Sequence, residues 1–247
     1  MESYRKIIRF IFFESRNTAM NRNNQIIALI AVFLVLIAGG YLLFYDRNPE
    51  QEYVIDQGDY LNGQDLIESI PASQLSEAEI QGLIQMREEE KLARDVYTTL
   101  GEKWGINIFF NIADSEQTHT DAVKDLIERY GLEDPVKDDG VGVFTSQVMD
   151  ELYGTLVTQG EASLVDALIV GATVEDLDIY DLSELLDETD NADIIIVYKN
   201  LSKGSRNHLR AFVSQIESRD GSYEPQYISQ ELYDEILSSE QEVGIVG

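Results

Sequence analysis

Residues 112 to 130 read IADSEQTHTDAVKDLIERY, and apolar side chains recur along them at steps of three and four positions. This spacing places the apolar side chains in one stripe along an α-helix and predicts that the stripe faces the core of a bundle. Two polar residues, Glu116 and His119, interrupt the stripe near its middle. Because they are three positions apart, both side chains project from the same helix face. The sequence therefore predicts a Glu-x-x-His pair inside a helical core.

Similar stripes predict the other elements of an all-α fold. We expect long helices at about 77–103, 108–130, 163–186 and 191–217, a shorter helix at about 147–158, and a last one from about 229. Ser76 and Glu79 have the spacing of a capping box, which predicts where the first long helix begins. A long connection separates the second long helix from the third. This order is typical of a ferritin-like four-helix bundle.

Polar residues interrupt all four long stripes, and both histidines of the chain are among them. An ionised carboxylate in an apolar core costs several kcal/mol unless it is paired, and no lysine or arginine lies on the stripes. Divalent metal ions would neutralise the cluster, and carboxylate with imidazole suits iron, manganese or zinc. The candidate metal ligands are Glu90, Glu116, His119, Glu175, His208 and Asp178. Two alternatives remain open: a structural polar layer, or a break near Gly171 that exposes the acids of the third helix.

The fourth long helix departs from the layout of di-iron bundles. In that layout two helices each contribute one glutamate, and the other two each contribute a Glu-x-x-His pair. Here Ser205 stands where the second pair would have its glutamate, three positions before His208. Together with Gly204 it predicts an open coordination position beside a metal held by His208. Two alternatives stay open: the small residues let helices approach closely, or Asp178 closes the site.

Two further expectations concern residues near the candidate ligands. Tyr97 and Tyr198 lie on the predicted stripes and are candidates to donate hydrogen bonds to metal ligands, although core packing is the commoner use of tyrosine. Glu88 and Glu89 precede Glu90 in a run of acidic residues. Because charge runs normally face water, we expect both of these side chains to be solvated.

Composition excludes several classes of function. The chain has no cysteine, so disulfides, zinc–thiolate sites and iron–sulfur ligation are excluded. Its formal net charge is −28. Residues 1–45 carry five basic and two acidic residues, whereas the rest carries 13 basic and 44 acidic ones. So negative a domain repels phosphate backbones, and we expect no nucleic-acid partner. No serine–histidine–acid arrangement supports a hydrolase.

The N-terminal part of the sequence predicts a membrane anchor. Residues 26–45 read IIALIAVFLVLIAGGYLLFY and contain no charge. As one helix, this run is long enough to cross a bilayer. Residues 1–25 carry the basic side chains and are expected in the cytoplasm. An acidic tether at 46–75 and the bundle domain at 76–247 would then lie outside the cell membrane. A cleaved signal peptide is the alternative, although this apolar run is longer than usual for one.

Several segments together resemble a known family. EEEKLARDVY, SEQTHTDAV, VGATVEDLDIYDL, GSRNHLRAF and YEPQYIS resemble the ferritin-like family called domain of unknown function 2202, and the first two resemble the metal helices of rubrerythrin. The resemblance covers about residues 75–237 and implies a ferritin-like fold and metal binding. We expect a di-iron centre that acts on oxygen, peroxide or iron as an oxidoreductase, and the sequence is compatible with a homodimer. The alternative is a non-catalytic anchored module with at most one structural metal.

Overall fold

The computed structural model describes residues 67–246, and their secondary structure is helical, with no strand. Its elements are α4 (Glu77–Trp104), α5 (Asn107–Arg129), α6 (Gln147–Gly160), α7 (Leu164–Asp187), α8 (Ala192–Glu217) and α9 (Gln230–Ser238). The prediction of an all-α fold is confirmed for these residues, and each helix predicted from residue 77 onward has a counterpart. Among the helices of this described part, none combines the length and the apolar character needed to cross a membrane. The predicted segments 1–25 and 26–45 lie outside the described residues.

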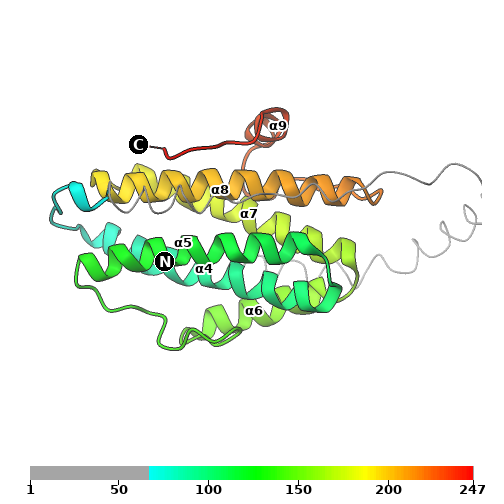
Figure 1. Cartoon of the computed structure of the whole chain (residues 1–247), viewed down its shortest axis with the longest axis horizontal. Helices are drawn as coiled ribbons and strands as arrows, with labels where there is room; N and C mark the ends of the chain where they lie inside the picture. The colour runs from blue at the N-terminus through cyan, green and yellow to red at the C-terminus, as the bar shows by residue number, and fades with distance from the viewer. Residues whose placement is uncertain (1–66, 247) are drawn as a thin grey trace, which may run out of the picture. The chain divides into compact units, whose positions relative to one another are not determined.

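The four long helices form two antiparallel hairpins (Figure 1). Helix α4 packs most extensively on α5, and α7 packs most extensively on α8. The hairpins meet through contacts of α4 with α7 and of α5 with α8. The connection from α5 to α7 passes through α6, which packs against α4 and α7. This crossover brings α7 back antiparallel to α4, as Figure 1 shows, so all four apolar stripes face one core.

Capping interactions explain where α4 begins and ends. The Ser76 hydroxyl accepts a hydrogen bond from the Glu79 backbone N–H at 3.2 Å, and the Glu79 carboxylate accepts one from the Ser76 N–H at 2.7 Å. The predicted capping box is therefore present. The second carboxylate oxygen of Glu79 accepts from Asn191 at 2.7 Å, which ties this end to the turn between α7 and α8. Helix α4 ends at Gly105, whose φ of 67° favours glycine.

A buried charge cluster fastens the loop between α5 and α6 to α4. The Lys91 ammonium group lies 2.5 Å from the Asp95 carboxylate and donates to the Gly140 carbonyl at 3.0 Å. Arg94 lies 2.7 Å from the other oxygen of Asp95. The same carboxylate accepts a hydrogen bond from the Gly142 N–H at 2.9 Å. Each of these charges is paired, as burial requires, and the cluster positions the crossover.

The segment after α8 is fastened to α7 by one buried carboxylate. Asp176 is fully buried and accepts from the Tyr223 hydroxyl at 2.8 Å. It also accepts from the backbone N–H groups of Gln226 at 2.5 Å, Tyr227 at 3.2 Å and Ile228 at 2.9 Å. These donors lie in the segment YEPQYIS. Asp176 is the neighbour of Glu175, so this contact fastens α7 at the level of the candidate ligands.

We expect Asp176→Ala to lower the free energy of unfolding by about 3 kcal/mol or more. The substitution leaves two buried donors, the Tyr223 hydroxyl and the Ile228 N–H, without their acceptor, and each such group costs about 1–3 kcal/mol. Urea unfolding followed by circular dichroism measures the change. Asp187→Ala, at an exposed position near the end of the same helix, is the matched control and should change stability by less than about 0.5 kcal/mol. Equal unfolding midpoints for the two variants would contradict this role of Asp176.

Candidate metal centre

A polar layer crosses the bundle between two apolar layers. On one side lies a buried cluster that includes Leu83, Val123 and Tyr198. On the other side the rings of Tyr97, Phe109 and Phe212 pack with centroids 5.2–6.4 Å apart. The six predicted ligands lie at the level between them, on α4, α5, α7 and α8. Water is therefore excluded from most of this layer, and its charges must be balanced locally.

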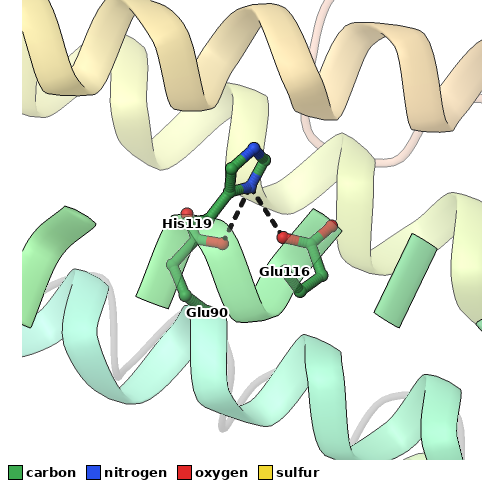
Figure 2. Close-up of side chains that lie close together, drawn as sticks. All are labelled: Glu90, Glu116 and His119. Atoms are coloured by element: carbon green, nitrogen blue, oxygen red, sulfur yellow. Dashed lines mark hydrogen bonds and ion pairs between the residues drawn. The ribbon is translucent and has the colours of Figure 1, made fainter. Parts of the chain in front are cut away.

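The first group of converging side chains comes from the α4–α5 hairpin (Figure 2). His119 Nδ1 lies 2.8 Å from Glu116 Oε2 and 3.3 Å from Glu90 Oε2. Glu90 and Glu116 are almost fully buried. One potential ligand atom from each of the three residues lies within 4.8 Å of the others. Helix α4 thus supplies one carboxylate, and α5 supplies the Glu-x-x-His pair.

The second group includes Glu116 again. His208 Nδ1 lies 2.7 Å from Glu116 Oε1 and 3.4 Å from Glu175 Oε2. These three residues also place one ligand atom each within 4.8 Å of one another. The two imidazole rings are stacked, with centroids 5.6 Å apart. Glu116 therefore directs one oxygen to each histidine, and the two groups are joined through its carboxylate.

Several buried atoms of these groups have no hydrogen-bond partner. They are Glu90 Oε1, Glu116 Oε1 and His208 Nδ1. The last two form an ion pair at 2.7 Å, although its geometry is not that of a hydrogen bond. Unpaired polar atoms in a dry core are unfavourable, and nearly all buried polar groups in proteins are satisfied. Carboxylate oxygens and imidazole nitrogens converging in this way suit iron, manganese or zinc ions, so the residues present fit a metal centre.

Two neighbouring side chains orient the second group. The Tyr97 hydroxyl donates to Glu175 Oε1 at 2.6 Å, as its place on the stripe suggested. Ser115 Oγ lies 3.0 Å from His208 Nε2. This contact leaves Nδ1 as the ring atom directed at the two carboxylates. The sequence analysis did not identify Ser115, because a serine inside a helix more often faces water or its own backbone.

The part of the chain that contains these residues is similar to known proteins. Residues 79–240 match the model of the family described as "Uncharacterized protein domain (DUF2202)". The chain therefore belongs to the DUF2202 family. It is 59% identical over 179 residues to the uncharacterized protein MJ0754 of Methanocaldococcus jannaschii, a match covering 72% of this chain and 97% of that protein. It is also similar to the crystal structure of hypothetical protein MJ0754 from Methanococcus jannaschii, with a TM-score of 0.69, 59% identity, and 70% and 99% of the two chains covered.

In this DUF2202 protein the small residues of α8 do not leave empty space. A Cβ atom on Gly204 would lie 2.4 Å from Cε1 of His119, so the imidazole fills the place of a side chain at that position. Ser205 donates a hydrogen bond to Asp178. The space that Gly204 and Ser205 leave is thus taken up by His119 and Asp178, while the open coordination position stays a prediction. These contacts favour the alternatives, because the two positions accommodate His119 and hold Asp178.

Other predictions for this DUF2202 protein also need revision. Glu88 is 7% exposed, so it is buried rather than solvated. Glu89 is partly buried, and burial together with the charges of Asp181 and Asp178 on α7 raises its pKa. Tyr198 lies in the apolar cluster, and its hydroxyl has no hydrogen-bond partner there. Helix α7 continues through Gly171 without a break and keeps its acids in the bundle.

Burial and mutual charge shift the pKa values across the polar layer. Burial raises the pKa of Asp178 to about 8, and the charge of Glu175 adds to this shift. Burial alone would lower the pKa of His208, but Glu116 and Glu175 outweigh it and raise that pKa to about 9. Burial would raise the pKa of Glu116, yet the two histidines hold it well below its usual range. The metal-free site thus retains protons that bound metal ions would displace.

We expect the metal-free protein to lose stability as the pH rises from about 6.5 to 9. The folded state holds a proton on His208 more tightly than the unfolded state, whose ordinary pKa is 6.5, so this stabilisation is full below pH 6.5 and is lost through about 9. Asp178 acts in the same direction between its ordinary value of 3.8 and about 8. Urea unfolding at several pH values measures the slope. His208→Gln should reduce it, and stability rising over this range would contradict the assignment.

Proposed function

We propose that this chain is a ferritin-like metal protein with two metal positions that share Glu116. One position would be held by Glu90, Glu116 and His119, and the other by Glu116, Glu175 and His208. The observation that carries the proposal is the pair of overlapping groups, joined by one carboxylate and containing buried ligand atoms without hydrogen-bond partners. The hairpin order with a crossover between α5 and α7 supports the ferritin-like assignment.

Iron is the metal we favour, with manganese and zinc as alternatives. The donor set contains only carboxylates and imidazoles, and the glutamates outnumber the histidines, as in di-iron bundles. A pair of iron ions would supply redox chemistry toward oxygen or peroxide, or the site would handle iron itself. The chain's own residues hold and orient the ligands: Tyr97 fixes Glu175, and Ser115 fixes the His208 ring. Asp178, held by Ser205, is a further acid at the edge of the layer.

The cellular setting is part of the same proposal. Residues 26–45 would anchor the chain in the cell membrane, with residues 1–25 in the cytoplasm and the helical domain outside. The uncharged apolar run and the basic residues before it support this arrangement. Oxygen, peroxide or iron ions would then reach the site from the outer side of the membrane.

A non-catalytic module with one structural metal is the second candidate. The first group supports it, because Glu90, Glu116 and His119 all come from the α4–α5 hairpin. A single ion there would stabilise one hairpin without involving α8. The number of bound ions therefore distinguishes the two candidates.

We expect the wild-type chain to bind two metal ions and the His119→Ala variant to bind one. This substitution removes a ligand of the first group and leaves Glu116, Glu175 and His208 in place, whereas Glu116→Ala damages both groups and should abolish binding. Equilibrium dialysis with elemental analysis measures the stoichiometry. Metal at a hundredfold excess over Kd should stabilise the folded protein by about 2.7 kcal/mol for each site that it occupies. Circular dichroism confirms that each variant is folded, and equal binding by the wild type and Glu116→Ala would exclude this site.

Redox activity has a separate test. The protein is loaded with iron(II) without oxygen and then exposed to oxygen or peroxide, while the absorption spectrum is followed. We expect iron oxidation to be faster than that of free iron(II), and azide to produce a new absorption band. Glu116→Ala, which lacks the shared ligand, is the control and should behave like buffer. If the wild type binds iron without faster oxidation or an azide band, the non-catalytic module is the better description.

A further inference from the structure

The last residues of the described chain lie along the outer face of α8 (Figure 1). The side-chain amide of Asn207 pairs with the backbone of Glu242: its Nδ2 donates to the Glu242 carbonyl at 2.9 Å, and its Oδ1 accepts from the Glu242 N–H at 3.0 Å. Asn200 pairs in the same way with Val246, at 2.9 and 3.0 Å. Each amide thus satisfies both backbone groups of one residue. Such contacts recognise the main chain and are independent of side-chain identity.

One side chain of this segment is recognised in addition. The carboxylate of Glu242 accepts from Arg206 Nε at 2.7 Å and Nη2 at 2.5 Å, and from Arg210 Nη2 at 3.1 Å. Paired contacts between a guanidinium and a carboxylate are among the stronger and more directional hydrogen bonds. Arg210 also donates to Asn207 Oδ1 at 2.8 Å and so orients that amide. Lys203 donates to the carbonyl of Gly244.

The side chain that follows Glu242 contributes little to recognition. Val243 follows Glu242 and is 86% exposed. Gly244 contributes its carbonyl and a bend with a φ of 78°, a conformation that favours glycine. The face of α8 therefore selects a main chain with this bend and one carboxylate. Any segment that provides these two features satisfies the same contacts.

We propose that the outer face of α8 is a docking site for an acidic segment of a partner protein, and that residues 242–246 close it in the resting chain. Charge complementarity supports this occupant: Lys203, Arg206 and Arg210 form a cationic stripe on a chain whose net charge is −28. The chain's own segment has the advantage of a tethered ligand, whose effective concentration is about millimolar for a short linker. A partner must therefore bind tightly or be present at high local concentration. The inference is independent of metal binding.

A synthetic peptide provides the test. Fluorescein-labelled SEQEVGIV, the sequence of residues 239–246, is titrated with the full chain and with a variant ended after Ser238. We expect the shortened variant to bind at least about tenfold more tightly, because its site is open. A peptide carrying Glu242→Gln should bind about tenfold or more weakly. A peptide with alanine in place of the exposed residues Glu240, Gln241 and Val243 should retain binding within about threefold, since these side chains make none of the contacts with α8.

Variants of α8 serve as controls. Arg206→Gln and Asn207→Ala should each weaken peptide binding to the shortened chain by about tenfold. Lys199→Gln removes the same type of charge from an exposed position on this helix and should have no effect, because Lys199 makes none of these contacts. Circular dichroism verifies that each variant is folded. Failure of the shortened chain to bind the peptide, or loss of binding by the alanine peptide, would overturn the proposal. Dimerisation of the full chain that the peptide abolishes would assign the site to a second copy and also overturn it.

Discussion

Glu116 lies between two histidines in a layer of the bundle from which water is largely excluded. One oxygen is 2.8 Å from His119 and the other is 2.7 Å from His208. Removing a carboxylate from water is unfavourable unless opposite charge is close, so these contacts constrain both helices that carry the partners. Glu90 and Glu175 then add negative charge beyond what two imidazoles balance. Burial, together with the charge of the neighbouring acids, raises the pKa of both Glu90 and Glu175.

Two buried carboxylates elsewhere in the domain differ from those of the central layer in their hydrogen bonding. Asp95 pairs with Lys91 and Arg94, and Asp176 receives four hydrogen bonds. Both carboxylates are fully buried and fully used, and each fastens a connecting segment to a helix. The central layer is where ligand-type atoms converge without hydrogen-bond partners. This contrast within one molecule is the reason to propose metal binding for the layer and a structural role for the other two carboxylates.

Helix α8 makes polar contacts on both its inner and its outer face. Its inner face carries His208, Ser205 and the glycine that accommodates His119. Its outer face carries the asparagines and arginines that hold residues 242–246. The family match ends at residue 240, so this segment lies just outside it while α8 lies within it. Because the helix is rigid, whatever occupies the outer face lies one helix diameter from the proposed ligands.

The sequence by itself determined the helices and the level of the polar layer. Apolar residues at steps of three and four specify which face of each helix is buried, and Glu116 with His119 shares that face by helical periodicity alone. The tertiary structure decided which side chains meet across helices. Ser115 reaches His208, Ser205 reaches Asp178, and Gly204 makes room for His119 only because α5, α7 and α8 pack at particular depths and rotations. These contacts join residues 27 to 93 positions apart, and no local pattern in the sequence specifies such pairs.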